Sequence, residues 1–195
     1  ARLHALFRPR VVATERLHFL PERLLQRFEP VQDDEQKDAA LVRYLAQHGD
    51  QKTMVFVKNA RELMRLYDAL KLKGSDVFRL HSDVPFPARL DTVRSFRASP
   101  AGVLLTTDIA ARGLDFTDVG HVIHHHPPSD VVVYMQRCGR TARMQRSGAS
   151  TCIFLPENAQ LIEEIKGCGA QRAVDDLFSR KRRFRKRIKR VQRAN

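Results

Sequence analysis

The sequence lacks the features that mark membrane-spanning, secreted or disulfide-linked proteins. No apolar run approaches the ~20 residues that cross a bilayer, and the first residues hold no apolar segment followed by a small-residue cleavage site. The three cysteines, Cys138, Cys152 and Cys168, are odd in number and lack CxxC spacing, which argues against a disulfide framework or a zinc site. We therefore expect an intracellular protein in a reducing compartment, with mitochondrial, nucleolar and cytoplasmic locations fitting equally.

The chain also lacks an initiator methionine, and its first residues begin in the middle of a pattern. We expect it to be a fragment of a longer protein. A targeting segment that had been removed would therefore be invisible in this sequence.

Basic charge is concentrated at one end of the chain. Of the 35 Lys and Arg residues, ten lie in residues 180–195 with no acidic residue, whereas residues 1–179 carry the other 25 against all 22 acidic residues. Phe184, Ile188 and Val191 recur at helical spacing, so a basic amphipathic helix on RNA or lipid is one interpretation of this tail. A solvated or disordered charged end and a targeting signal are the others.

Strand-like and helix-like patterns alternate between residues 33 and 158. Short apolar runs predict strands at 53–57, 77–80, 102–107, 120–125 and 147–155, and helical patterns cover 33–49, 59–74 and 87–97. This order predicts an α/β fold, with a parallel sheet and helices on both faces. We expect residues 1–27 to be a linker or the end of a preceding lobe, residues 28–170 the folded domain, and residues 171–195 a basic tail.

Ligands of such sheets bind beyond the carboxyl ends of the strands. The loops to search are those after Val57, Leu80, Thr107 and His126. The run His124–His126 does not favour a metal site, because consecutive strand residues point to alternate faces; a polar strand end near a domain interface is the better interpretation. The segment 33–36, which holds three acidic residues, opens a helix and is expected to cap it.

The segment QRCGRTAR, residues 136–143, packs three arginines into eight residues. If it is helical, Gln136, Arg140 and Arg143 fall within a narrow arc at about 100° per residue, with Arg137 turned to the side. Like charges on one face repel each other, so such a face usually meets an anion. Surface salt bridges are the alternative.

Four segments, in order, resemble the second RecA-like lobe of superfamily 2 helicases, and most closely the DEAD-box RNA helicases. TMVFVKN and HSD stand where that family has motif IV and its HGD element, TDIAARGLD resembles motif V, and QRCGRTAR resembles motif VI. The resemblance runs from about Phe28 to Leu155. It implies ATP as the nucleotide, an RNA backbone bound without sequence preference, and an N-terminal lobe that holds most of the ATP and its Mg²⁺.

For the nucleotide, the resemblance assigns Arg140 and Arg143 as the two arginine fingers of motif VI, whose planar forks suit phosphate oxygens. Arg112 matches the motif V arginine that helps to organise the attacking water. Asp115 matches the acid that accepts a ribose hydroxyl, and Gly113 belongs to the same cofactor-binding segment. A mutual ion pair between Arg112 and Asp115 that caps the turn is the alternative.

For RNA, the resemblance assigns contacts with the backbone only. Thr107 matches a threonine that donates to a phosphate, and Arg89 matches an arginine that contacts another. Ser82 and Asp83 occupy a loop whose main chain approaches RNA in the family. Phosphate contacts fix position and register, so no base preference follows from these four residues.

Four positions depart from the family pattern. Gln136 replaces a His, and it can form hydrogen bonds but cannot titrate, so the link between the nucleotide and RNA sites is expected to be retuned. Ser82 replaces the Gly of HGD and narrows the approach of the main chain to RNA. Phe86 replaces a Gln, which removes a polar RNA contact, and Ala142 replaces a Gly, a small change.

Neither G-x-x-x-x-G-K-[ST] nor a DEAD box occurs in the chain, so it cannot assemble an ATPase alone. The first hypothesis is the C-terminal lobe of an ATP-dependent RNA helicase, an RNA-stimulated hydrolase that remodels RNA or RNA–protein complexes. The alternative is a helicase-derived RNA-binding assembly factor with weak or no hydrolysis; a superfamily 2 DNA helicase fits less well. A basic tail suits a large ribonucleoprotein such as a ribosomal precursor as the partner.

Overall fold

The computed structural model describes residues 23–72, 74–108, 118–142 and 146–168, together with Leu20, Leu114 and Phe116. Its strands are β1 (Leu24–Pro30), β2 (Lys52–Phe56), β3 (Val77–Leu80), β4 (Gly102–Thr106), β5 (His121–His124) and β6 (Gly148–Phe154). Its helices are α1 (Asp34–Gln47), α2 (Ala60–Leu72), α3 (Phe86–Ala98), α5 (Val131–Cys138), the 3₁₀ turn η1 (Pro156–Asn158) and α6 (Ala159–Cys168).

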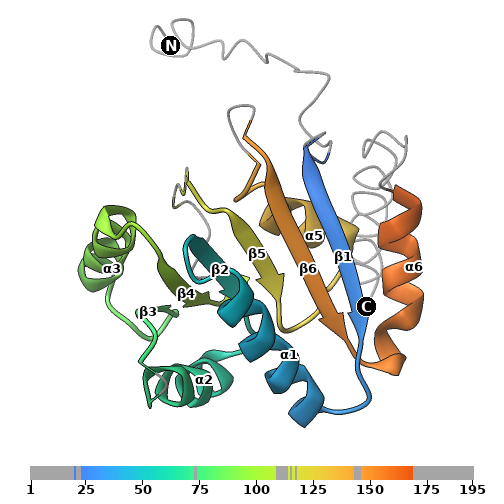
Figure 1. Ribbon diagram of the computed structural model, residues 1–195, viewed down its shortest axis with the longest axis horizontal. Helices are drawn as coiled ribbons and strands as arrows, with labels where there is room; N and C mark the ends of the chain where they lie inside the picture. The colour runs from blue at the N-terminus through green and yellow to red at the C-terminus, as the bar shows by residue number, and fades with distance from the viewer. Residues whose placement is uncertain are drawn as a thin grey trace, which may run out of the picture. The chain divides into compact units, whose positions relative to one another are not determined.

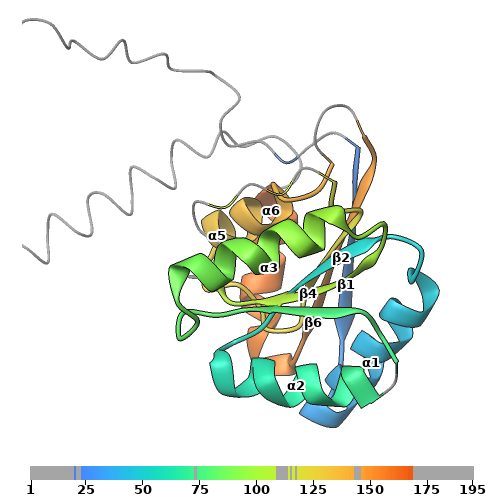
Figure 2. The ribbon, with the colours of Figure 1, turned by 90° about the vertical axis from the view of Figure 1, so that its left-hand side faces the viewer.

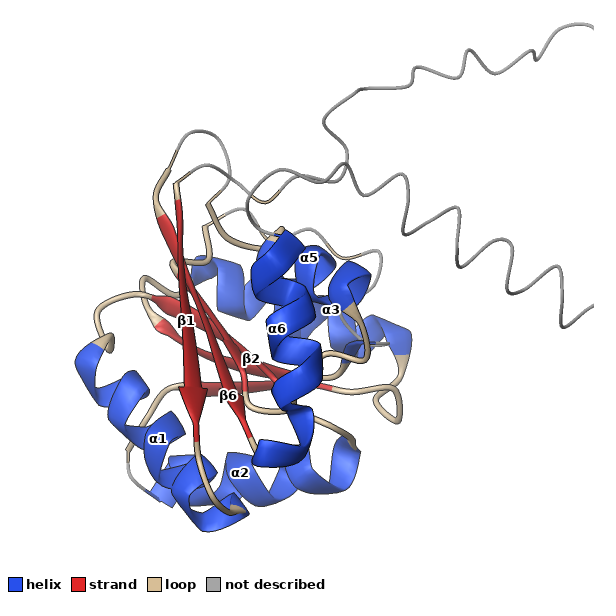
Figure 3. Ribbon diagram, turned by 90° about the vertical axis from the view of Figure 1, so that its right-hand side faces the viewer, coloured by secondary structure: helices blue, strands red, loops and turns tan. Residues whose placement is uncertain are grey.

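The strands form one parallel sheet in the order β1-β6-β5-β2-β4-β3, and helices cover both of its faces (Figure 1). Helices α1 and α2 lie on one face, whereas α3, α5 and α6 lie on the other, as the two turned views show (Figure 2, Figure 3). The predicted α/β class with helices on both faces is confirmed. The predicted strands and helices all form, with ends that differ by one or two residues.

Two apolar cores hold the layers together, one on each face of the sheet. In β2, Met54 belongs to the core under α3 and Val55 belongs to the core under α1 and α2. Successive strand residues point to opposite faces, so a central strand covered on both sides needs apolar residues throughout. This explains why all five residues of β2 are buried and why Met54, Val55 and Phe56 form an apolar run that continues into the buried Val57.

Side chains cap the first two helices as their sequences predict. Asp33 Oδ1 accepts a hydrogen bond from the Gln36 amide (2.7 Å), and Asn59 Oδ1 accepts one from the Glu62 amide (2.9 Å). The Glu62 carboxylate in turn accepts a hydrogen bond from the Lys58 amide (3.0 Å). The acidic segment 33–36 is therefore a helix cap, as expected.

The domain begins earlier than the predicted residue 28, because β1 starts at Leu24. This strand pairs with β6 in register from Leu24 opposite Gly148 to Pro30 opposite Phe154. It lies at the edge of the sheet, and its residues alternate between exposed and half-buried at its start. An edge strand needs no continuous apolar run, which is why the polar residues of this segment concealed it.

His124–His126 form a polar strand end, as expected, and the structure adds that His124 and His125 are buried. His121, at the start of β5, is buried as well. His121 Nε2 lies 2.8 Å from Thr151 Oγ1, and His124 Nε2 lies 3.0 Å from Ser150 Oγ, so a hydroxyl of β6 is a hydrogen-bond partner of Nε2 in each ring. Burial lowers the pKa of His121 to about 4 and lowers that of His124 as well. These rings are therefore neutral core residues near pH 7.

The described residues include neither a candidate membrane span nor a candidate metal cluster. No helix among them is both long and apolar enough to cross a membrane. No group of three or more His, Cys, Asp or Glu side chains among them is arranged to hold a metal ion.

Candidate functional site

The predicted RNA-contacting segments meet at the carboxyl edge of the sheet. Thr107 follows β4 directly, and the loop with Ser82 and Asp83 follows β3. The two strands are neighbours, and Leu80 pairs with Thr106 at their ends. The parallel topology thus places both segments at one edge of the lobe, as a shared ligand would require.

A buried ion pair fastens helix α5 to the end of β4. The side chain of Arg137 is only 3% exposed, and it donates from Nε and Nη2 to the two carboxylate oxygens of Asp108, at 2.7 and 2.8 Å. Nη1 donates to the carbonyl of His126 (2.7 Å), and the guanidinium lies over the ring of Phe56, 4.8 Å from its centroid. This bidentate pair, which we call the Arg137–Asp108 clamp, fixes motif VI against motif V.

Motif VI is helical only in its first part. Helix α5 ends at Cys138, and Thr141 beyond it forms an isolated parallel bridge to the chain before β5. The single helical face predicted for Gln136 and Arg140 is therefore wrong, because Arg140 lies in the turn that follows the helix. Gly139 stands at the end of the helix, where its low helix propensity favours termination.

Arg140 links this turn to motif V. Its side chain is half-buried, and Nη1 donates to the carbonyl of Leu114 at 2.6 Å. Gln136 is exposed on α5. The predicted site residues Arg112, Gly113, Asp115 and Arg143 lie outside the described residues, so their roles remain predictions.

Two small residues allow motif VI to pack against β6. Ala142 has a φ of +54°, in the left-handed region that strains any residue with a Cβ. The family's Gly at this position avoids that strain. At Gly148, a Cβ would lie 2.2 Å from Thr141 Oγ1, so only glycine fits where β6 begins.

On the RNA side, the predicted loop is exposed and polar. Ser82 Oγ donates to Asp83 Oδ1 at 3.1 Å, and both residues are exposed. Arg89 is half-buried in α3, and its guanidinium carbon lies 5.4 Å from the centroid of the Phe86 ring. Arg89, which is predicted to bind an RNA phosphate, therefore contacts Phe86, which stands where the family has a Gln.

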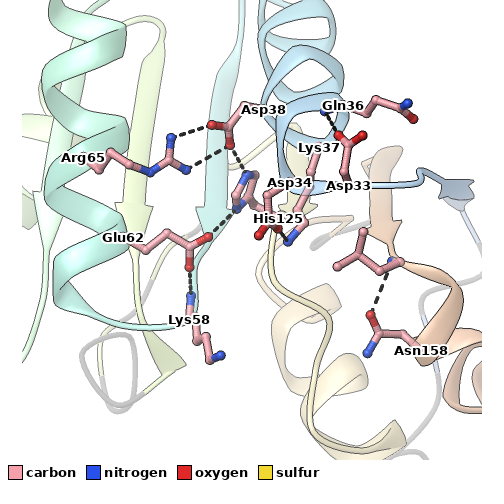
Figure 4. A network of polar contacts seen from close by, with 11 residues as sticks. Asp33, Asp34, Gln36, Lys37, Asp38, Lys58, Glu62, Arg65, His125 and Asn158 are labelled. Atoms are coloured by element: carbon pink, nitrogen blue, oxygen red, sulfur yellow. Dashed lines mark hydrogen bonds and ion pairs between the residues drawn. The ribbon is translucent and has the colours of Figure 1, made fainter.

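A second polar cluster, which the sequence analysis missed, surrounds His125 (Figure 4). His125 is 1% exposed, and its Nε2 lies 2.8 Å from Asp38 Oδ1 while its Nδ1 lies 3.3 Å from Glu62 Oε1. Arg65 on α2 donates to both oxygens of Asp38. The contact with His125 is the main cause that lowers the pKa of Glu62 to about 2.

The His125 cluster joins three elements that are distant in the sequence. Asp38 comes from α1, Glu62 and Arg65 come from α2, and His125 directly follows β5. A polar cleft of about 560 Å³ lies beside it, lined by the first turns of α1 and α2, by His126 and by the segment that contains Glu157. The next residue, His126, presents its carbonyl to Arg137, so this cluster abuts the Arg137–Asp108 clamp.

Sequence comparisons match this chain to a known domain family. Residues 36–145 match the family model of the helicase conserved C-terminal domain. The chain is 40% identical over 124 residues to the Arabidopsis thaliana protein named DEAD-box ATP-dependent RNA helicase 13. The matched segment is 64% of this chain but only 15% of that protein.

Solved structures show the same fold. The Escherichia coli DEAD-box protein SrmB, solved with the regulator of ribonuclease activity A, superposes with a TM-score of 0.69 at 28% identity, covering 74% of this chain and 85% of that one. Saccharomyces cerevisiae Dbp5, solved with RNA and ADP BeF3, superposes with a TM-score of 0.70 at 25% identity. The superposition covers 76% of this chain and 40% of the Dbp5 chain. The chain therefore belongs to the helicase conserved C-terminal domain family, as a C-terminal RecA-like lobe of the DEAD-box type.

Proposed function

We propose that this chain is the C-terminal half of the motor of an ATP-dependent RNA helicase, which remodels RNA or RNA–protein complexes. The observation that carries this proposal is the Arg137–Asp108 clamp, which holds motif VI against motif V at the carboxyl edge of the sheet. Because this ion pair fastens the end of α5, it holds the following turn, which carries Arg140, in one position. A preorganised cation at a fixed position is what stabilisation of a phosphoryl transition state requires.

On the nucleotide side, Arg140 and Arg143 supply guanidinium groups to the γ-phosphate of ATP, and Arg112 helps to orient the attacking water. Asp115 and Gly113 hold the ribose, and Gln136 connects this site to the RNA side by hydrogen bonding. ATP is the substrate, and its Mg²⁺ is held by an N-terminal lobe that brings the P-loop. The contact between Arg140 and the Leu114 carbonyl supports this arrangement, because it brings motif VI to motif V.

On the RNA side, Thr107, Ser82, Asp83 and Arg89 contact the backbone. Thr107, Ser82 and Asp83 follow the ends of β4 and β3, and Arg89 lies at the start of α3, which comes next after that loop. This arrangement supports one continuous track for a strand. Dbp5, which shares this fold, was solved with RNA and a nucleotide analogue bound. The lobe would close against its N-terminal partner when ATP and RNA bind together.

The partner is a large ribonucleoprotein, such as a ribosomal precursor, to which the basic tail adds non-specific affinity. Its ten basic residues without an acid would neutralise RNA phosphates and release counterions. The protein acts inside the cell. A second candidate function is an RNA-binding assembly factor with weak hydrolysis, which Gln136 and Phe86 favour because they replace family residues on the nucleotide and RNA sides.

The test is ATP hydrolysis by the natural two-lobed protein, with and without RNA. We expect RNA to raise the rate, and we expect Thr107→Ala to reduce this stimulation while the rate without RNA is unchanged. Leu72→Ala, at an apolar position on α2 that is 90% exposed, is the control. RNA binding without any RNA-dependent turnover would favour the assembly factor instead.

A further inference from the structure

Phe86 presents an aromatic ring to solvent at the predicted RNA edge. It is the first residue of α3 and is 57% exposed, and among the described residues only Leu25 and Leu72 are comparable large apolar side chains on the surface. A single exposed apolar residue needs no explanation in itself. The residues around this ring, however, suggest a reason for its exposure.

Two features restrict Phe86, one acting on its backbone and one on its ring. Pro85 and Pro87 flank it, which restricts the backbone on either side. The guanidinium carbon of Arg89 lies 5.4 Å from the ring centroid, within the range of a cation–π contact. Little conformational entropy remains to be lost when such a ring binds a ligand.

Arg89 also retains an unused donor. Its Nε is buried and has no acceptor within the part of the chain that the structure describes, although the residue as a whole is half-buried. A half-buried arginine beside an exposed aromatic ring suits a ligand that carries an anion next to a flat apolar group. A nucleotide within an RNA strand has both, as a phosphate and a base.

The position of the pair agrees with this ligand. Phe86 follows the loop of Ser82 and Asp83 at the end of β3, and Thr107 stands at the end of the neighbouring β4. A strand that contacts these segments through its backbone therefore passes close to the start of α3. The ring lies where the family has a Gln, so the sequence alone suggested only that a polar contact is lost.

We infer that Phe86 and Arg89 form a stacking subsite for one unpaired nucleobase of RNA, with Arg89 bound to the adjoining phosphate. The inference rests on the proposed RNA-binding function and adds a base contact to it. Stacking on an aromatic ring tolerates every base, because each base has a π-face. The subsite therefore selects unpaired over paired nucleotides rather than one sequence over another.

The experiment measures binding of a short fluorescein-labelled oligoadenylate and of the same strand with abasic riboses, by fluorescence anisotropy with the full 195-residue chain. We expect Phe86→Leu to weaken binding of the base-bearing strand about tenfold, within the range for loss of one base–aromatic stack. Binding of the abasic strand should change by less than about twofold. Phe86→Trp should retain binding of the base-bearing strand, and Leu72→Ala is the matched surface control.

The basic tail has the same sequence in parent and variant, so a difference between their affinities is assigned to residue 86. The stacking subsite would be overturned if Phe86→Leu weakened the binding of both strands equally, or if it weakened the binding of neither. The second of these results would leave the ring as part of a protein-binding surface. Arg89→Ala and Thr107→Ala test the backbone contacts separately. If these two variants weaken binding and Phe86→Leu does not, the proposed RNA face stands and only the subsite fails; if none of the three has an effect, both fail.

Discussion

The Arg137–Asp108 clamp can be tested by removing each partner alone and then both. Asp108→Ala leaves a guanidinium that is 3% exposed without its counter-charge. Removal of one partner from a buried pair costs ~3–5 kcal/mol, and because the side chain of Asp108 is 33% exposed, water can replace part of the interaction. We therefore expect Asp108→Ala to lower the free energy of unfolding by about 3 kcal/mol.

Arg137→Met keeps the length of the side chain and leaves only the more accessible carboxylate unpaired, so it should cost about 2 kcal/mol. The double variant leaves no unpaired charge and should cost about 3 kcal/mol, which corresponds to a coupling of about 2 kcal/mol. Urea-induced unfolding followed by circular dichroism measures all four proteins.

The exposed pair of Asp91 and Arg94 on α3 provides a matched control. Their side chains are 71% and 76% exposed, with 3.2 Å between Arg94 Nη1 and Asp91 Oδ1. The same cycle on this pair should give a coupling below about 0.5 kcal/mol. A coupling free energy below about 0.5 kcal/mol between Arg137 and Asp108 as well would refute the view that the clamp holds motif VI in place.

Three further predictions follow from the same contacts. Ala142→Gly should raise the unfolding midpoint by about 2–4 °C, since it removes about 1 kcal/mol of left-handed strain; a thermal melt measures this, and an unchanged midpoint would contradict it. Stability should fall as the pH is lowered from about 6.5 to about 4, because the unfolded chain binds a proton at His121 in this range and the folded chain does not. Urea unfolding at several pH values should show a smaller fall for His121→Gln. Burial raises the pKa of Cys138 and Cys152 to about 11 and about 12, so iodoacetamide should label neither thiol in the folded protein near pH 7.5, as peptide mass spectrometry can check.

Elements defined by local patterns could be predicted from the sequence. Asn59, directly before helix α2, is its N-cap, and the apolar run from Met54 to Val57 reflects the burial of β2 on both faces. Strand β1 could not be found in this way. It lies at the edge and is recognisable only once β6 stands beside it.

Contacts that join distant residues escaped the sequence analysis. Asp108 lies 29 residues before Arg137, and Asp38 lies 87 residues before His125, so no local spacing reveals either pair. One signal was present for the clamp, since Arg137 is the one charged residue of a helix whose first five residues, from Val131 to Met135, are apolar or aromatic. A buried charge of this kind requires a partner, and an aspartate at the end of a strand is a suitable one.

The central claim is that motif VI of this lobe supplies arginine fingers to ATP hydrolysis. The most direct test is single-turnover hydrolysis by the natural two-lobed protein with RNA present, comparing the parent with Arg140→Ala, Arg143→Ala and the surface control Arg94→Ala. We predict that each finger variant loses about 10³-fold or more in rate while the control keeps the parent rate. A loss of less than about tenfold in both finger variants, with RNA and nucleotide still bound, would contradict the account.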